Sequence, residues 1–359
     1  MEKNNKPLQI YMDKHEICLS MNEDGQYFPF TYKNNKGEWV VPLKGDIIFD
    51  WITYVKRTVG SEINPITRRK IDGNLNPMQW GISINIINSL IQYKTDIYSL
   101  MASRQTGKTF VLEHVQSFMT VFGRRYKTEL KGNKWTTISM SHKKESVTKN
   151  FLGIRKGIKR AVEVYNDLYG SQNHKIVYGN YTLESGDKKT TTDKDDLLRL
   201  DCVVGYDSSV EWGECYALTA QTDSDGMTSA FTAVDESTLI DAKQFFRSIL
   251  PFSSANGGSI VCTGITCTDP SKLQYAVYEN KDSKKITYSW VDYYRIMKVV
   301  DPKQAEIYKA SVETQIQACG GHESTEAQTN YYMSWDLSEG LFTNRTQLRN
   351  NNVYETTIS

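Results

Sequence analysis

The sequence predicts an α/β fold in which helices flank a mostly parallel β-sheet. Between Asn76 and about residue 300, amphipathic helical segments alternate with short apolar segments rich in β-branched residues. Strands of a parallel sheet are buried on both faces and therefore appear as short apolar runs between helices. One such run, residues 96–103, leads into a loop that ends in Gly-Lys-Thr and opens an amphipathic helix. In such a sheet, the loops that follow the strands lie at the ligand-binding edge.

Composition narrows the class of protein. The chain has 359 residues, a net charge of +1 and 39% hydrophobic residues, as is typical of a globular protein with a sizeable core. No apolar run is long enough to span a membrane, and the first residues lack the apolar core of a secretory signal, so no membrane partner is expected. The six cysteines form no C-x-x-C pair and the five histidines are dispersed. This argues against a disulfide framework or a zinc site and fits a reducing cytoplasm.

Three regions are expected along the chain. Residues 1–75 form an N-terminal extension, in which "YFPFTYKNNKGEWVVPL" predicts a β-hairpin around an Asn-Asn-Lys-Gly turn. Residues 76–300 form the α/β core. Residues 301–359 are rich in Gln, Glu and Tyr and predict a small helical subdomain followed by the start of a linker.

Within the core, the helical period and the β-branched runs predict the order of the elements. Helices are expected at residues 77–93, where Pro77 suits the first turn, at 110–122, where Gly123 should end the helix, and at 144–170. Strands are expected at residues 96–103, 134–142, 230–237 and 258–266, with added or antiparallel strands at 175–180, 181–186 and 215–222.

The loop "SRQTGKT" predicts a phosphate-binding site of the P-loop NTPase class, in its RecA-like (ASCE) branch. Backbone N–H groups of such a loop and of the following helix N-terminus point at phosphate oxygens, and Gly107 allows their close approach. Lys108 would reach the β- and γ-phosphates and Thr109 would hold Mg²⁺, so ATP and Mg²⁺ are the expected cofactors. Ala102 stands where the common pattern has its first glycine, and a chance Gly-Lys-Thr at a helix start is the alternative. The residues expected around the phosphates are Ser103, Arg104, Gln105, Thr106, Gly107, Lys108 and Thr109.

The strand "AFTAVDES" ends in two adjacent carboxylates, Asp235 and Glu236. A strand of this kind supplies one acid to hold the Mg²⁺ shell and a second acid to activate the attacking water. Neighbouring side chains of a strand point to opposite faces, so the two acids can take these separate roles. The alternative is a helix N-cap, because Asp-Glu-Ser also suits a helix start.

A third polar strand end follows the apolar run at residues 258–266. It carries Thr263, Gly264 and Thr266. Because this edge of a doubly wound sheet faces the ligand, these residues could sense the γ-phosphate and pass its loss onward. A plain threonine-rich turn is the alternative.

Positive charge is concentrated in residues 121–160, which contain twelve Lys or Arg and only two acids. Clustered cations of this kind fit a groove that follows a DNA backbone. The alternative is a set of lysines that only solvate helix surfaces. The side chains that a helix could present together to DNA are Lys143, Lys144, Arg155, Lys156, Lys159 and Arg160.

Three segments, "SRQTGKT", "VDE" and the strand ending "TGIT", together resemble the ATPase domain of the large terminase subunit of tailed bacteriophages. That family's loop commonly reads S-R-Q-x-G-K-T and tolerates a non-glycine at its first position, which accounts for Ala102. "LNPMQW" is similar to the family's adenine-recognising segment, with Gln79 as the glutamine. "NYYMSWDLSEGLF" is similar to the segment that closes its lid subdomain. The resemblance covers roughly residues 75 to 345.

The resemblance implies a packaging motor that hydrolyses ATP to drive double-stranded DNA into a procapsid. It also implies a ring of copies docked on the portal protein in the host cytoplasm, a small terminase subunit as partner, and a chain that is mostly monomeric when isolated. The roles carried over are phosphate and Mg²⁺ binding for Lys108 and Thr109, metal binding for Asp235, water activation for Glu236, γ-phosphate sensing for Arg104, and coupling for Thr263, Gly264 and Thr266.

Two features depart from the family pattern. Many relatives carry an Arg-Gly pair about ten residues before the acidic pair, where this chain has Asp225-Gly226, so Arg104 or Arg247 remains as the candidate arginine finger. Large terminases also normally carry a C-terminal nuclease of the RNase H type. The chain stops at Ser359, which leaves no room for that domain and predicts an excised ATPase fragment, or one part of a split protein, without nuclease activity.

Two other functions fit the same motifs. A two-lobed helicase, acting as a nucleic-acid-dependent ATPase, shares the loop, the acids and the upstream glutamine. It needs a second RecA-like lobe, which nothing after residue 270 supplies. A nucleotide-gated binding module would use ATP as a clamp and would not need Glu236. ATP turnover measured with and without double-stranded DNA separates the three.

Overall fold

The computed structural model describes most of the chain between residues 9 and 335. The described ranges are 9–63, 70–130, 134–169, 174–177, 179–182, 188–191, 199–206, 210–220, 227–267 and 269–335. The Asp225-Gly226 pair, most of the strand expected at 181–186, and the end of the lid-like segment after residue 335 lie outside these ranges.

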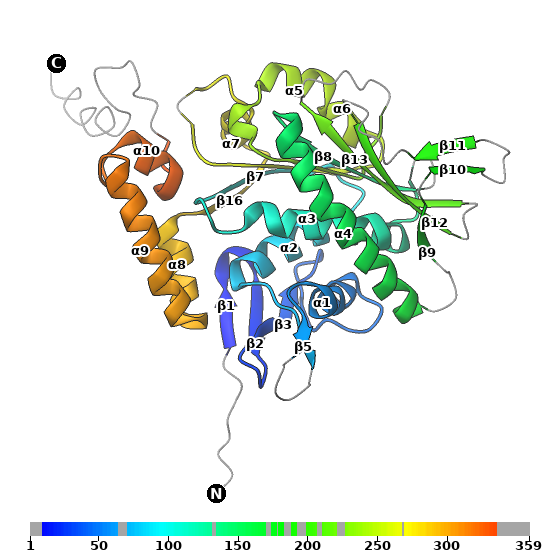
Figure 1. Cartoon of the computed structure of the whole chain (residues 1–359), viewed down its shortest axis with the longest axis horizontal. Coiled ribbons are helices and arrows are strands. Elements are labelled where there is room, and N and C mark those ends of the chain that lie inside the picture. Colours follow the sequence, from blue (N-terminus) through cyan, green and yellow to red (C-terminus); the bar gives the residue numbers. More distant parts are fainter. Residues whose placement is uncertain are drawn as a thin grey trace, which may run out of the picture.

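An eight-stranded sheet forms the centre of the molecule, with the order β16-β7-β15-β14-β8-β13-β12-β9 (Figure 1). Six strands from β16 to β13 run parallel, while β12 and β9 extend the sheet antiparallel. The strands are β7 (Ile97–Ala102), β8 (Trp135–Ser141), β9 (His174–Val177), β12 (Arg199–Tyr206), β13 (Val210–Thr219), β14 (Phe231–Val234), β15 (Ser259–Gly264) and β16 (Lys284–Tyr288).

The sheet confirms the predicted fold class. All four expected central strands are present, and the strand that carries the loop, β7, is separated from the acid-bearing strand β14 by β15. This order is that of the RecA-like branch. The segment expected as an added or antiparallel strand at 215–222 falls in β13, which pairs parallel with β8 and antiparallel with β12. The chain therefore changes strand direction beside β13.

Helices cover both faces of the sheet (Figure 1). On one face lie α1 (Ile47–Thr58), α2 (Pro77–Leu90), α3 (Lys108–Tyr126) and α4 (Lys144–Tyr169), and on the other lie α5 (Ala242–Ser248), α6 (Leu250–Ser254) and α7 (Leu273–Glu279). Side chains of β15 alternate between these faces, because Val261 joins the first core and Ile260 and Cys262 join the second. Of the helices that the structure describes, none is long and apolar enough to cross a membrane.

The N-terminal region forms a four-stranded antiparallel sheet of β1 (Gln9–Met12), β2 (Ile17–Met21), β3 (Tyr27–Lys33) and β4 (Trp39–Val40). The predicted hairpin is confirmed in β3 and β4, and two further strands precede it. This sheet shares one core with the nucleotide-loop side of the molecule, since Ile17, Trp51, Trp80 and Phe118 belong to a single buried cluster. Two small hairpins, β5 (Glu62–Ile63) with β6 (Lys70–Ile71) and β10 (Gly179–Thr182) with β11 (Lys188–Thr191), complete the strands.

A separate small core holds the C-terminal helices together. It contains Trp290, Val312, Ile316, Ala327 and Tyr331. These side chains come from α8 (Trp290–Val300), α9 (Pro302–Ala318), α10 (Thr325–Ala327) and the π-helical segment η3 (Gln328–Tyr332). The helical subdomain expected from residue 301 therefore includes α8 and begins at Trp290.

The predicted end of the loop helix at Gly123 is wrong, because α3 continues to Tyr126. Gly123 is required for packing instead, since a Cβ atom there would lie 2.3 Å from Cδ2 of the Trp135 ring. Trp135 is fully buried at the start of β8. A sequence cannot distinguish this glycine from a helix stop, because the contact comes from another element.

A similar close contact joins α3 and α4, and it predicts the effect of Gly157→Ala. A Cβ atom at Gly157 would lie 2.2 Å from Oγ of the buried Ser117 and 3.1 Å from the Tyr54 hydroxyl. The two helices would have to separate, so we expect the free energy of unfolding to fall by about 1–3 kcal/mol. Chemical denaturation measures this change. Leu152→Ala on the exposed face of α4 is the control and should shift stability by no more than about 0.5 kcal/mol.

Candidate active site

The loop between β7 and α3 has the conformation of an anion-binding turn. Gly107 caps α3 with φ 79° and ψ 28°, and Gln105 also has a positive φ of 64°. A left-handed conformation at the cap favours glycine, which has no Cβ atom to clash. The first N–H groups of α3 have no partners within the helix, and the helix dipole adds positive potential to them. Such a turn can bind phosphate.

Contacts from distant segments hold this loop in place. The Thr106 hydroxyl donates to the Ser103 carbonyl at 2.8 Å, and the Ser103 N–H donates to the Tyr288 carbonyl of β16 at 2.9 Å. The Arg104 guanidinium donates through Nε to Oδ1 of Asn330 at 3.0 Å. The loop is therefore fixed on one side by the sheet edge and on the other by the C-terminal helices.

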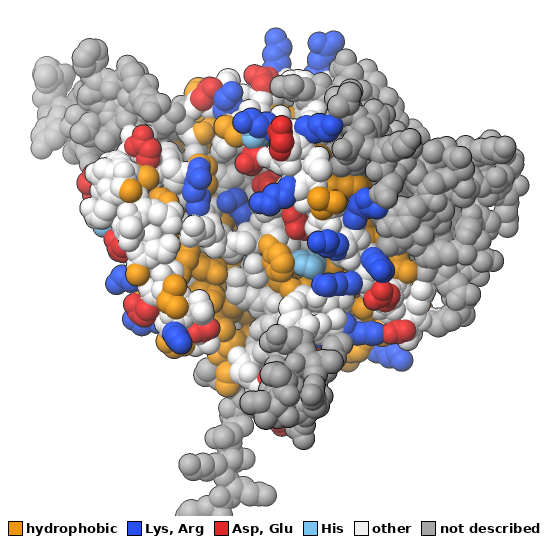
Figure 2. Space-filling view, in the orientation of Figure 1, with side chains coloured by type: hydrophobic (Ala, Val, Ile, Leu, Met, Phe, Trp, Pro, Cys, Tyr) orange, Lys and Arg blue, Asp and Glu red, His pale blue; other side chains and the backbone are white. Residues whose placement is uncertain are grey.

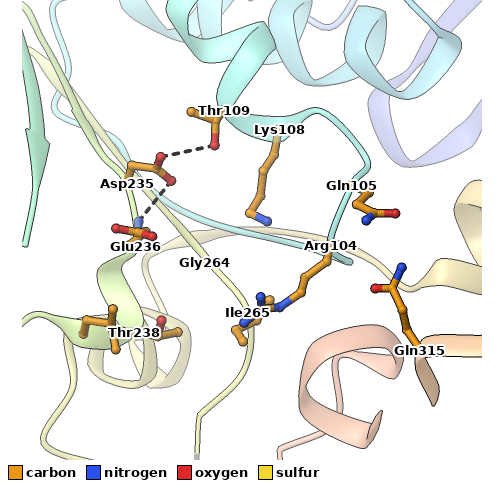
Figure 3. A pocket seen from close by; sticks show the side chains of 11 residues that line it. Arg104, Gln105, Lys108, Thr109, Asp235, Glu236, Thr238, Gly264, Ile265 and Gln315 are labelled. Carbon is orange, nitrogen blue, oxygen red and sulfur yellow. Dashed lines mark hydrogen bonds between the residues drawn. The ribbon is translucent and has the colours of Figure 1, made fainter. Parts of the chain in front are cut away.

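A cavity of about 480 Å³ opens beside the loop (Figure 3). Its walls come from the loop and the start of α3, from the ends of β14 and β15, and from α9. It brings together predicted residues that are up to 160 positions apart, since Arg104 and Gly264 both line it. The lining residues are Arg104, Gln105, Lys108, Thr109, Asp235, Glu236, Thr238, Leu239, Gly264, Ile265 and Gln315.

Lys108 extends its ammonium group into this cavity, where Nζ donates to the Ala102 carbonyl at 3.2 Å (Figure 3). Burial lowers the pKa of Lys108, and the charges of Asp235 and Glu236 partly oppose that change. A poorly hydrated ammonium interacts strongly with an incoming anion, because little water has to be displaced.

Asp235 is surrounded by four donors. Its Oδ2 accepts from the Thr109 hydroxyl at 3.2 Å and from Nδ2 of Asn150 at 3.1 Å. Its Oδ1 accepts from the Glu236 N–H at 3.0 Å and from the Thr263 hydroxyl at 3.5 Å. These contacts fix the orientation of the carboxylate.

The Thr109 hydroxyl and the Asp235 carboxylate are hard oxygen donors that fit Mg²⁺. In the part of the chain that the structure describes, no three His, Cys, Asp or Glu side chains gather as a protein-only metal site. That donor set suits Mg²⁺, which commonly takes one or two protein oxygens and completes its shell with phosphate and water.

Glu236 has a left-handed backbone with φ 54° and ψ 38°, and its side chain makes no helix cap. The carboxylate turns toward the end of β8 instead. Oε2 accepts from the hydroxyls of Ser141 and Ser146, each at 3.1 Å. Nδ1 of His142 lies 2.9 Å from the same oxygen, without the alignment of a hydrogen bond. The helix-cap interpretation of this acid is therefore wrong.

The threonines after β15 connect the cavity to the C-terminal helices. Thr263 contacts Asp235, Gly264 lines the cavity, and the Thr266 hydroxyl donates to the Thr329 carbonyl in η3 at 3.1 Å. A shift of this strand end would thus be felt at both places.

Gln79 lies beside the loop but does not line the cavity. Its amide accepts from the Asn76 N–H at 3.1 Å and donates to the Gly107 carbonyl at 3.2 Å. The segment that precedes the sheet is thereby joined to the loop, and recognition of adenine by Gln79 stays a prediction.

The six predicted DNA-binding cations lie on α4 and in the turn before it. Lys143, Lys156, Lys159 and Arg160 are exposed, whereas Lys144 and Arg155 are half-buried. Arg160 also donates to the Thr58 carbonyl of α1 at 2.9 Å. Lys and Arg side chains gather on the face of the molecule that carries α4 (Figure 2). Of the two candidate finger arginines, Arg104 lines the cavity and Arg247 lies on α5.

Sequence reasoning missed the groups that orient the two acids. Asn150, Ser141, Ser146 and His142 contact them, although none belongs to a recognised motif. One signal was present, because Ser141 and His142 end a central strand at the same sheet edge as the acids.

Glu113, one turn after the loop, predicts a pH-dependent stability. Burial and the charge of Asp235 raise the pKa of Glu113 to about 7, although Lys149 partly opposes this. The folded protein therefore binds a proton more tightly than the unfolded chain, and stability falls as pH rises from about 4.5 through 7. Glu113→Gln keeps the neutral form, so we expect it to raise the free energy of unfolding by about 1–2 kcal/mol at pH 8.5 and little at pH 4.

Urea denaturation in EDTA at the two pH values measures this difference. Glu163→Gln, on an exposed part of α4, is the control and should show no such pH dependence. Equal effects of Glu113→Gln at both pH values would contradict the assignment.

Comparison with known proteins gives a structural likeness only. No protein-family model and no curated protein matches the sequence. The structure is similar to large terminase ATPase domains of several bacteriophages.

The ATPase domain of the Thermus phage P74-26 large terminase aligns with a TM-score of 0.43 and 12% identity over 71% of this chain and 92% of that domain. The HK97 large terminase gives 0.48 and 15% over 80% and 55%. The large terminase of a thermophilic bacteriophage in complex with ADP gives 0.42 and 11% over 73% and 54%. This chain thus spans about half the length of the latter two proteins. We base no residue role on likenesses of this size.

Proposed function

We propose that this chain is the ATPase motor domain of a viral large terminase and hydrolyses ATP with Mg²⁺ to translocate double-stranded DNA into a procapsid. The observation that supports it most is the meeting of Lys108, Thr109, Asp235 and Glu236 around one cavity beside an anion-binding turn. A clamp that only binds nucleotide has no need of the second acid. This favours turnover over a nucleotide-gated binding module.

In the proposed reaction, the loop amides and Lys108 bind the triphosphate and stabilise the charge that develops on the transferred phosphoryl group. Thr109 and Asp235 would hold Mg²⁺, which supplies Lewis-acid stabilisation of the phosphate oxygens when bound. Glu236 accepts the proton of the attacking water. Arg104 senses the γ-phosphate, and its bond to Asn330 gives the C-terminal helices a means to respond.

Around this site we propose a ring of copies on the portal protein, with the small terminase subunit as a further partner, at a procapsid in the host cytoplasm. The isolated chain is then mostly monomeric and a weak ATPase. Residues 121–160 take part in backbone-directed contact with DNA, and Thr263, Gly264 and Thr266 couple hydrolysis to movement.

ATP turnover in the presence and absence of double-stranded DNA tests the function. A motor domain should turn over slowly alone and faster with duplexes of unrelated sequence. A helicase-like ATPase should respond to single strands and separate a duplex. A binding module should bind nucleotide without phosphate release, and that result would exclude the proposed activity.

Charge removal on α4 tests the DNA contact. Replacing Lys143, Lys144, Lys156 and Lys159 with Ala should weaken binding of unrelated duplexes equally and flatten the dependence of affinity on salt, because fewer counterions are released. Each lost phosphate contact should reduce the slope of log affinity against log salt by about 0.9. Fluorescence anisotropy at several salt concentrations measures both.

The control removes the same charge from exposed lysines elsewhere, in Lys36, Lys44, Lys281 and Lys303. It should leave the salt slope unchanged. Equal behaviour of the two quadruple variants would mean that the α4 lysines only solvate the helix.

A further inference from the structure

We propose that the turn from Ser141 to Ser146 restrains the Glu236 carboxylate, and that a polyanion bound by Lys143 and Lys144 releases it. This inference rests on the proposed ATPase function and adds how its rate is regulated. It concerns the state in which the structure holds the second acid.

The first observation is the crowding of donors on one oxygen. Ser141 and Ser146 both donate to Oε2 of Glu236 at 3.1 Å, and His142 Nδ1 lies 2.9 Å away. A carboxylate oxygen has about two lone-pair directions, so this oxygen is occupied. Hydrogen bonds to a carboxylate are also stronger than neutral ones and hold its orientation. The group that must accept a proton from water is thus committed to the protein.

The second observation is the backbone of Glu236. Its φ of 54° places a non-glycine residue in the left-handed region, which costs free energy that other contacts must offset. The two serine contacts supply such an offset. When they are broken, the residue can leave this conformation. The restrained state is therefore one of two arrangements, which is what a switch needs.

The third observation is the position of the restraining groups. His142 precedes Lys143 and Lys144 directly, and Ser146 lies in the first turn of α4. Lys143 is exposed and no described acid pairs with it among the ion pairs of the structure. Phosphates that attract these two ammonium groups would pull on the turn that holds Glu236. Asn150, one turn further, holds Asp235 at 3.1 Å, so α4 contacts both acids.

The test compares Ser141→Ala/Ser146→Ala with the wild-type chain in ATP turnover, with and without double-stranded DNA. Removing both donors should raise the rate without DNA by about tenfold and reduce the stimulation by DNA to about twofold or less. Ser146→Thr keeps a hydroxyl and should behave as the wild type. Lys143→Ala/Lys144→Ala should lower the stimulation by DNA. Adding Lys108→Ala to the double serine variant should abolish its turnover, which ties the measured rate to this site.

Each outcome decides the proposal. A lower rate in the double serine variant, both with and without DNA, would mean that the serines position Glu236 for catalysis, and it would overturn the restraint. An unchanged stimulation ratio, or a wild-type rate that DNA does not alter, would overturn it as well while the ATPase function stands. A wild-type chain that releases no phosphate under either condition would remove the proposed function together with this inference.

Discussion

Lys108→Ala should reduce ATP turnover at least about a hundredfold while the chain remains folded. The ammonium extends into the cavity beside the anion-binding turn, and burial lowers its pKa. A cation already stripped of most water stabilises developing phosphate charge without reorganisation, so its loss cannot be compensated by solvent. Steady-state phosphate release and equilibrium binding of a labelled nucleotide measure the two effects.

Thermal unfolding of the Lys108→Ala variant provides the test of folding. Its midpoint should not fall, because the substitution removes a buried charge that pairs directly with a carbonyl rather than with a carboxylate. Lys281→Ala, an exposed lysine outside the cavity, is the matched control and should keep the wild-type rate. Wild-type turnover by Lys108→Ala would remove the loop from the proposed mechanism.

The two acids should fail in different ways. Glu236→Gln should bind ATP and leave it unhydrolysed, because the amide cannot accept the proton of the attacking water. Asp235→Asn should weaken Mg²⁺-dependent binding, because its carboxylate has the Thr109 hydroxyl at 3.2 Å and Asn150 at 3.1 Å as fixed neighbours of a cation site. We expect turnover to fall at least about a hundredfold in both variants.

Nucleotide affinity measured over a range of Mg²⁺ concentrations separates the two roles. Glu236→Gln should keep the wild-type Mg²⁺ dependence and retain intact ATP after separation from free nucleotide. Asp241→Asn, an exposed acid that caps α5, is the control for loss of a carboxylate near the site. The same binding defect in both variants, with no retained ATP, would show that the acids share one role.

The parts of the site that the sequence predicts are those with local causes. Gly107 must be glycine because α3 begins with a left-handed residue, and the Gly-Lys-Thr that surrounds it is visible in seven letters. Asp235 and Glu236 follow a run of four buried residues, so their place at the end of a strand is also a local property. Hydrophobic period and turn residues likewise predict the hairpin of β3 and β4.

The contacts that decide how these residues act come from distant segments. Asn150 reaches Asp235 across 85 positions, and Asn330 reaches Arg104 across 226. Neither asparagine belongs to a pattern, because an amide that orients a carboxylate can come from any element that packs nearby. Gly123 fails as a helix stop for the same reason, since the Trp135 ring that requires it belongs to another strand.

The core that the N-terminal sheet shares with α1 to α4 has a consequence for synthesis of the chain on the ribosome. Ile17 and Trp51 are fully buried in one cluster with Phe118 and Tyr165, which follow them by about one hundred residues. At about 5–20 residues per second, the first strands wait roughly 5–20 s for those partners. During that interval the nascent chain exposes the aromatic and aliphatic side chains of its first fifty residues. A chaperone that binds extended apolar segments should therefore associate with short nascent chains and dissociate once α4 has emerged.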